Sequence, residues 1–461
     1  MPRIEDEPVD RRVGGRIPTA SDPFLLTSFE KYFIADERRP DFPATVPLRW
    51  TVSDVPQRDQ FAAAFRTAIS WHPMLGCLVR RGGWQPHSEA VGEVAYFPKG
   101  ERPRNEDRAV DPHKGPIMRC NVLESDPESG GATVIELVVH HAVIDGVSLI
   151  EFIGDVFAIY ANAIGSLDAS KLRRPHHRYL VKRQLVDRQI PSPVSRATAW
   201  KVMASESLRF FTRRAEPFVS ERPEPRRGGH PAWHLVDASL DRATTDRLAA
   251  SASELNATLN DFAVASLLRV IGQWNDRHRR RLGRGWLVAN MPVLLRPRAA
   301  VRTSAANMIG YGLIARQRDS LADWSTLAQG IAIESRFIQQ WKMAALFLDG
   351  LSAASRLPGG LFLGTRLTRP ATCVVTHIGD PLRRFRVKFP VNEDGLPIVG
   401  DLTLLRMSGA APLRPGTHVA GMLHTLGGCL GLSLRVPPSH VSLENASELI
   451  SLWKQDLVSH R

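Results

Sequence analysis

The sequence contains few cysteines, and none of them is spaced as in a metal site or a redox motif. Four cysteines are scattered over 461 residues, at Cys77, Cys120, Cys373 and Cys429. This pattern suits buried free thiols in a reducing compartment better than a disulfide framework. We therefore expect neither a disulfide-stabilised fold nor a metal ion held by cysteines.

No segment predicts a secretory signal or a membrane-spanning helix. Residues 1–22 are charged and rich in proline, and they lack an apolar core. The longest apolar candidate, residues 343–364, is interrupted by Asp349, Arg356 and Pro358, and it falls short of a span. We expect a cytoplasmic protein, which leaves peripheral contact with a membrane open.

The composition is that of a globular chain with an excess of positive charge. With 43% hydrophobic and 23% charged residues, the 461 residues can form two domains of ordinary size. The formal net charge of +13 comes partly from clusters at residues 173–174, 226–227 and 277–284. Solvated faces explain such clusters, as does the attraction of a phosphate-bearing or acidic partner. No zinc spacing or aromatic-interleaved basic module is present, so we expect no nucleic-acid partner.

Helices and strands alternate along both halves of the chain, which predicts an α/β fold. The first half predicts helices at 58–70 and 147–160, and strands at 74–79, 117–123 and 133–141. The second half predicts strands at 233–237, 286–295 and 432–436, and helices at 260–274 and 446–457. A proline-rich stretch with one or two helices around 197–211 separates the halves. We therefore divide the chain into residues 1–165, a connecting segment 166–231, and residues 232–461.

A double histidine ends the buried strand, in the run HHAVIDG at residues 140–146. Neighbouring side chains on a strand point to opposite faces, so His140 and His141 cannot share one metal ion unless the strand breaks between them. We expect no metal there, with one imidazole packed inside and the other reaching a cleft. From the residues alone, a structural and a catalytic role are equally open.

Asp145 and Gly146 follow the strand and begin the next helix. A carboxylate in this place can cap the helix by accepting backbone N–H groups. It can also pair with a buried arginine that fixes the turn. Gly146 allows a close approach that a Cβ atom would block.

The HHxxxDG run resembles the signature of the superfamily of condensation domains and CoA-dependent acyltransferases. Further segments resemble this superfamily in the same order along the chain, over roughly residues 24–457. They are WHPML at 71–75, GPIMR at 115–119, ATLND at 257–261, MPVLLR at 291–296 followed by Asn307, and THIG at 376–379. The chain is more similar to bacterial condensation-like or wax ester synthase-like members than to the plant BAHD branch, whose DFGWG motif is missing.

The resemblance implies a fold and an activity. The fold is α/β, with two chloramphenicol acetyltransferase-like subdomains forming a pseudo-dimer and a channel between them that donor and acceptor enter from opposite faces. The activity is transfer of an acyl group from a CoA or acyl-carrier-protein thioester to a hydroxyl or amine of a small molecule or lipid. His141 would be the general base and would later protonate the leaving thiolate. No permanently bound cofactor and no metal is implied.

The resemblance also suggests roles for neighbouring residues. His140, Asp145 and Gly146 would shape the site, and Asp145 would pair with a buried arginine, with Arg296 the first candidate and Arg119 the second. Backbone N–H groups near Gly146 would stabilise the oxyanion. The residues expected to bind substrate are Ser148, Asn307, Thr376 and Gly379.

Some positions depart from the superfamily pattern and keep a second hypothesis open. Trp71 and Gly76 stand where relatives have arginines in an RHxxLR-like segment, and Thr376-His377 replaces a Ser-Asn pair. The alternative is a non-catalytic docking or scaffold protein that keeps the fold and has lost turnover. The intact HHxxxDG run favours the enzyme.

Overall fold

The structure, a computed structural model, describes residues 24–36, 42–177, 179–180, 183, 201, 213–219, 233–278, 285–296, 302–361 and 371–460. The helices expected around residues 197–211 lie outside these residues. So do residues 1–22, the basic pair at 226–227 and the basic residues 279–284.

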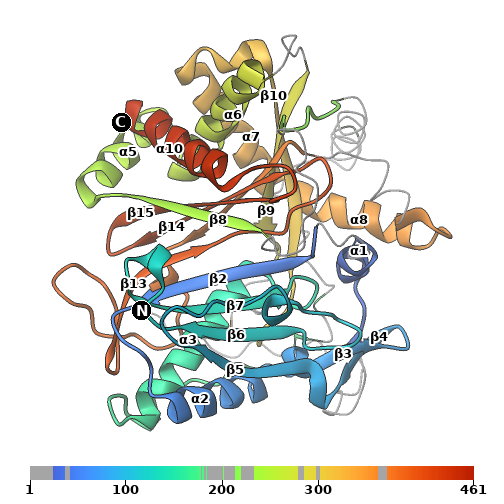
Figure 1. The fold of residues 1–461 in the computed structure, drawn as a ribbon. Helices are drawn as coiled ribbons and strands as arrows, with labels where there is room; N and C mark the ends of the chain where they lie inside the picture. The colour runs from blue at the N-terminus through green and yellow to red at the C-terminus, as the bar shows by residue number, and fades with distance from the viewer. Residues whose placement is uncertain are drawn as a thin grey trace, which may run out of the picture.

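Two six-stranded sheets carry the fold, and Figure 1 shows them as a lower and an upper layer. The lower sheet has the order β12-β13-β2-β7-β6-β5, and the upper sheet has the order β10-β9-β11-β14-β15-β8. A three-stranded sheet, β1-β4-β3, is separate from both. The lower strands are β2 (Thr45–Val52), β5 (Val91–Phe97), β6 (Met118–Leu123), β7 (Thr133–His140), β12 (Ile398–Val399) and β13 (Leu402–Gly409). The upper strands are β8 (His234–Leu240), β9 (Trp286–Leu294), β10 (Ile309–Gln317), β11 (Cys373–Gly379), β14 (Val419–Leu426) and β15 (Cys429–Val436), and the small sheet consists of β1 (Phe24–Leu25), β3 (Cys77–Arg80) and β4 (Gly83–Pro86).

Helices cover the outer faces of both sheets, so the α/β class is confirmed (Figure 1). The lower sheet carries α2 (Arg58–Ser70) and α3 (Gly146–Ala163). The upper sheet carries α5 (Arg242–Glu254), α6 (Leu259–His278), α7 (Trp324–Gln340) and α10 (Leu443–Ser459). Two further helices, α1 (Ser28–Asp36) and α8 (Met343–Ser355), pack against each other at one edge of the molecule.

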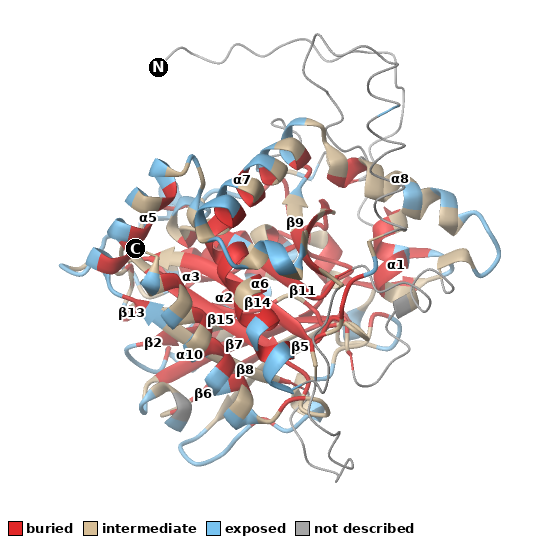
Figure 2. Cartoon of the chain, turned by 90° about the horizontal axis from the view of Figure 1, so that it is seen from above, coloured by how far each residue is buried: buried red, intermediate tan, exposed pale blue. Residues whose placement is uncertain are grey.

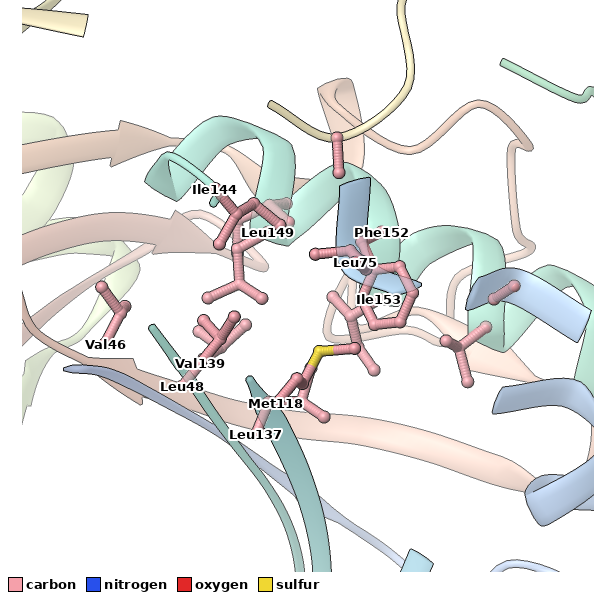
Figure 3. Close-up of a cluster of buried hydrophobic side chains, with 14 of the residues drawn as sticks. Val46, Leu48, Leu75, Met118, Leu137, Val139, Ile144, Leu149, Phe152 and Ile153 are labelled. Atoms are coloured by element: carbon pink, nitrogen blue, oxygen red, sulfur yellow. The ribbon is translucent and has the colours of Figure 1, made fainter. Parts of the chain in front are cut away.

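The burial pattern follows this layering (Figure 2): the strands are buried, while α5 and α7 turn one face to solvent. Helix α3 is the exception, because most of its residues are buried on every side. Its apolar residues meet the lower sheet, and Leu149 points toward Leu48 and Val139 in Figure 3. By length and composition alone α3 could cross a membrane. Since 78% of that window is buried inside the fold, α3 is the core helix of the lower layer.

One expected strand is wrong in part. Residues 74–79 were expected to be extended, but Pro73–Gly76 forms a 3-10 turn and the strand covers only Cys77–Arg80. Proline favours the first position of a helical turn because its φ is fixed and it has no N–H to lose. The turn is closed by the N–H of Leu75, which donates to the carbonyl of His72 over 2.9 Å.

The sheets do not follow the division of the chain into halves. Strands β12 and β13 come from the second half, yet β13 pairs antiparallel with β2 and completes the lower sheet. Arg435 of β15 makes a second contact between the sheets. Its buried guanidinium donates a hydrogen bond to the carbonyl of Thr45, at the start of β2, over 2.5 Å. The boundaries at residues 165 and 232 stay a prediction. Two strands of the lower sheet, β12 and β13, lie beyond the second boundary in the sequence.

The face of β7 that points away from α3 holds a buried acid between two arginines. The carboxylate of Glu136 is fully buried and accepts from Nε of Arg49 over 2.9 Å and from Nε of Arg108 over 2.7 Å. Burial alone would raise the pKa of Glu136, but the two guanidinium groups outweigh it and lower the pKa to about 2. This carboxylate therefore stabilises the folded state in its charged form.

Glu136→Gln should lower the free energy of unfolding at neutral pH by roughly 3–5 kcal/mol, because it leaves two arginines without their counter-charge. The native pKa of about 2 lies below the ordinary value of 4.5. The stabilisation is therefore complete above the higher value and is lost as the pH falls through the lower one. Denaturant unfolding of both proteins across this range should show a smaller acid dependence in the variant. Glu106→Gln, in the exposed pair with Arg104, is the control and should cost less than about 1 kcal/mol. Equal losses in both variants would contradict the assignment.

Candidate functional site

His141 comes directly after the last residue of β7 and lies between the two sheets. Its side chain is buried, with 5% of the residue exposed. Its Nδ1 lies 2.7 Å from the carbonyl oxygen of Ile144, and its ring centroid lies 4.7 Å from that of Phe33. Because a carbonyl oxygen can only accept, Nδ1 carries the proton of the neutral ring. The lone pair is therefore on Nε2, which is the nitrogen a general base needs.

The protonation state of His141 agrees with this geometry. Burial lowers its pKa to about 4, although the Ile144 carbonyl and the charge of Asp145 both act to raise it. At neutral pH the imidazole is uncharged and can accept a proton. A base with so low a pKa is always available at neutral pH, but its affinity for the proton is modest.

Two cavities meet at His141. The larger, of about 140 Å³, lies between the start of α3, the first residues of β2, the end of β9 and the second half of β11. The smaller, of about 20 Å³, lies between Phe33 of α1, the middle of β9, and the loop after β13. His141, Pro292 and Ala411 belong to the walls of both cavities. The imidazole can therefore be reached from two sides.

Asp145 holds the turn after β7 through hydrogen bonds to backbone groups and to Arg296. Its carboxylate accepts from the N–H of Ser148 over 2.7 Å, which caps α3. It also accepts from the N–H of Met308 over 3.0 Å and from Arg296 over 3.3 Å. The structure thus has the expected Asp145–Arg296 pair. Arg119 is elsewhere, on β6, and its Nε donates to the carbonyl of Ala109.

The carboxylate of Asp145 is the first of three along one face of α3. Glu151 and Asp155 follow at helical spacing, and all three are buried. Arg296 joins Asp145 to Glu151, and Arg386 joins Glu151 to Asp155. We name these five side chains the α3 charge network. Glu151, Asp155 and Arg386 were not predicted, although two carboxylates four residues apart in an otherwise apolar helix are the signal that could have revealed the first two.

His72 extends the α3 charge network to the loop before β10. Its Nδ1 accepts from the N–H of Ala305 over 2.8 Å, so its Nε2 carries the proton and donates to Asp155 over 2.9 Å. Burial lowers the pKa of His72, in spite of the neighbouring Asp155. The neutral ring that this implies is the form that the two hydrogen bonds require. The WHPML segment thus fixes the loop behind the site.

His140 and Gly146 lie where a structural role would place them. His140 is fully buried, and its Nδ1 accepts from the N–H of Ala142 over 3.2 Å. Gly146 belongs to the wall of the larger cavity, where a Cβ atom would come within 3.2 Å of Ile378. Any side chain at residue 146 would narrow this cavity beside His141.

The four residues expected to bind substrate are in different surroundings. Thr376 belongs to the wall of the larger cavity, and Gly379 lies just beyond it at a φ of +77°. Ser148 is fully buried, and its hydroxyl donates to the carbonyl of Ala306 over 2.8 Å. Asn307 donates to the carbonyl of His141 over 2.6 Å. Ser148 and Asn307 therefore fasten the loop at 305–308 to the turn after β7, and only Thr376 faces a cavity at His141.

Within the described ranges, no group of three or more His, Cys, Asp or Glu side chains could hold a metal ion. The neutral imidazole of His141 is a group in this site that can accept a proton.

No family model matches the chain. The uncharacterized protein Rv2305 of Mycobacterium tuberculosis is 26% identical over 357 residues, which cover 75% of this chain and 79% of that protein. Three solved structures have similar folds. The nonribosomal peptide synthetase FmoA3 matches 96% of this chain with a TM-score of 0.61 and 15% identity, but the chain spans only 45% of its length.

The other two solved structures match over nearly their full lengths. The starter condensation domain of rhizomide synthetase, solved with C8-CoA and Leu-SNAC, has a TM-score of 0.60 and 13% identity, covering 95% of this chain and 94% of that one. The trichothecene 15-O-acetyltransferase TRI3 from Fusarium sporotrichioides has a TM-score of 0.66 and 11% identity, with the same coverage. The expected fold, that of condensation domains and chloramphenicol acetyltransferase-like enzymes, is therefore confirmed.

Asp145→Asn should reduce the free energy of unfolding by about 3–5 kcal/mol, because it leaves Arg296 buried with only Glu151 as counter-charge. Asparagine can still cap α3, so the loss reports the ion pair. Asp323→Asn is the matched control, since Asp323 caps α7 on the surface and should change stability by less than about 1 kcal/mol. Chemical denaturation of both variants measures the difference. If Asp145→Asn lowers the free energy of unfolding no more than Asp323→Asn does, the Asp145–Arg296 pair contributes nothing to stability.

Proposed function

We propose that this chain, which has the fold of condensation domains, is an acyltransferase with His141 as its general base. It moves an acyl group from a CoA or acyl-carrier-protein thioester to a hydroxyl or amine of a small molecule or lipid. One observation carries the proposal: a neutral imidazole with its lone pair on Nε2 lies where two cavities meet. A reaction between two substrates that enter separately needs such an arrangement.

The transfer balances without a cofactor and without an acyl-enzyme. The acceptor's O–H or N–H gives its proton to Nε2 of His141 while its oxygen or nitrogen bonds to the thioester carbonyl carbon. The tetrahedral intermediate collapses as the C–S bond breaks. The proton on Nε2 then passes to the sulfur of the leaving thiolate. The products are an ester or amide and a free thiol.

The wall of the larger cavity suits an acyl chain. It is formed mainly by aliphatic side chains, including Val46, Leu149 and Met422, while His377 and Arg384 belong to its more polar part. A neighbour of the same fold, the rhizomide synthetase starter domain, was solved with C8-CoA. The chain's net charge of +13 also favours a donor that carries phosphate groups or an acidic carrier protein.

The same proposal covers location and partners. Cys77, Cys120 and Cys373 are buried free thiols, which supports a reducing, cytoplasmic setting. No resident cofactor or nucleic acid has a part in the reaction. An acyl carrier protein is the macromolecular partner that the proposal allows, as an alternative to free CoA.

His141→Ala should lower acyl transfer by about 10²–10⁴-fold, because it removes the base. The measurement is thiol release from acyl-CoA donors of graded chain length with a panel of alcohols and amines. Circular dichroism and thermal unfolding show that the variant is folded. Acyl transfer at the wild-type rate by the folded variant would contradict the role of His141 as general base. No turnover of any donor by the wild-type protein would favour the scaffold hypothesis.

The pH dependence of kcat/KM provides an independent check on the base. Because the pKa of His141 is about 4, the imidazole is deprotonated throughout the neutral range. The rate should therefore be level around neutrality and fall only in acid, as the pH approaches the pKa. An inflection near the ordinary histidine value of 6.5 would mean that the base is another group or that His141 is exposed to water in the working enzyme.

A further inference from the structure

The two cavities at His141 differ in chemical character. Apart from His141, the larger has polar side chains only along the segment from Thr376 to Arg384, and the rest of its wall is apolar or glycine. The smaller combines aromatic and aliphatic residues with four polar side chains: Asn290, Tyr311, Arg414 and Thr417. An acyl chain and a polar acceptor would therefore be sorted to opposite sides of the imidazole.

Asn290 is a buried polar side chain in the wall of the smaller cavity. It lies in the middle of β9, between Leu313 of β10 and Val374 of β11, with 6% of its surface exposed. Its Oδ1 has no hydrogen-bond partner among the described residues. A buried amide oxygen in this state destabilises the protein, because it has lost its hydrogen bonds to water. It would be satisfied by a ligand that brings an N–H or O–H donor.

Arg414 provides positive charge at the same cavity. Its guanidinium carbon lies 4.6 Å from the centre of the Tyr32 ring, which holds the side chain by a cation–π contact. Burial lowers its pKa to about 10, so the group is still charged at neutral pH. A guanidinium has five N–H donors in a planar fork, which lets one arginine contact protein and ligand together. Its preferred ligand is a carboxylate or a phosphate.

The volume of the smaller cavity limits what can enter. About 20 Å³ is room for roughly one water-sized group. Only the reacting end of an acceptor, an amine or a hydroxyl, fits beside His141 and Asn290. Arg414 is only partly buried, so the part of the acceptor that follows the reacting group would lie along it.

We infer that the Asn290–Arg414 side of His141 binds the acceptor, and that the acceptor is an amine or alcohol with an anionic group close to its nucleophile. An amine can donate one N–H to Oδ1 of Asn290 and another to Nε2 of His141, which leaves its lone pair facing the thioester carbon. The single O–H of an alcohol binds Oδ1 first and turns to Nε2, which takes the proton as the oxygen attacks. Arg414 binds the anionic group. The inference rests on the proposed function, because it assigns the two substrates of that reaction to two sides of one base.

The test measures binding separately from turnover. In His141→Ala protein, isothermal titration compares leucine with leucinamide, and 3-hydroxybutyrate with its methyl ester. Arg414→Gln should weaken binding of the two anions about tenfold or more, and Arg414→Lys by less, while binding of the neutral partners changes less than about twofold. Asn290→Leu should weaken all four probes. Arg383→Gln, whose side chain is 86% exposed, is the matched control and should change none.

Wild-type and Arg414→Gln proteins are then compared in transfer from octanoyl-CoA, where only the acceptor KM should rise. Equal affinity for the anionic and neutral probes, or anion binding unchanged by Arg414→Gln, overturns the inference. If anions bind through Arg414 but the wild-type protein transfers no acyl group, the acyl-transfer proposal fails, and the anion-binding site is real but is not an acceptor site. If transfer to neutral acceptors proceeds and Arg414→Gln does not alter the acceptor KM, the proposal stands and the inference fails.

Discussion

Charged groups buried between α3 and the loop at 302–308 hold the two layers in register. The α3 charge network links three carboxylates of the lower layer to Arg296 and Arg386, which come from segments that follow strands of the upper layer. Taking such charges out of water is costly, and the cost is recovered only when every partner is in place. The network therefore contributes less to net stability than to a unique packing arrangement. Any shift of α3 along the loop would leave a buried charge without its partner.

The geometry around His141 depends on this registration. Asn307 binds the backbone of His141, and the N–H of Met308 binds Asp145, so the loop that the network fixes also fixes the turn after β7. The imidazole itself is held by the carbonyl of Ile144 in that turn. The proposed base thus gets its position from backbone groups and its environment from both layers. The carboxylate of the signature acts on the scaffold and has no direct contact with the reacting nitrogen.

Local patterns in the sequence predicted the parts of this arrangement that depend on neighbours along the chain. The apolar density of residues 133–141 predicted β7, and the Asp-Gly step predicted the capped start of α3. The resemblance added Arg296, which no local pattern could provide. Contacts between distant segments were missed: β13 beside β2, Arg386 between Glu151 and Asp155, and the inward faces of Asn290 and Arg414. Ser148 was expected in the site because it follows the signature, but its helical position points it at the loop.

The pairing of β13 with β2 sets an order for the synthesis of this protein. Strand β2 ends at Val52 and β13 begins at Leu402. About 350 further residues must therefore be synthesised before β13 can pair with β2, which takes roughly 20–70 s at ordinary rates of translation. During that time the nascent chain presents the unpaired backbone of an apolar strand, which is the kind of edge that other chains can pair with. The first half is consequently not a unit that finishes folding when it leaves the ribosome. Its last strand arrives only when most of the second half has been made.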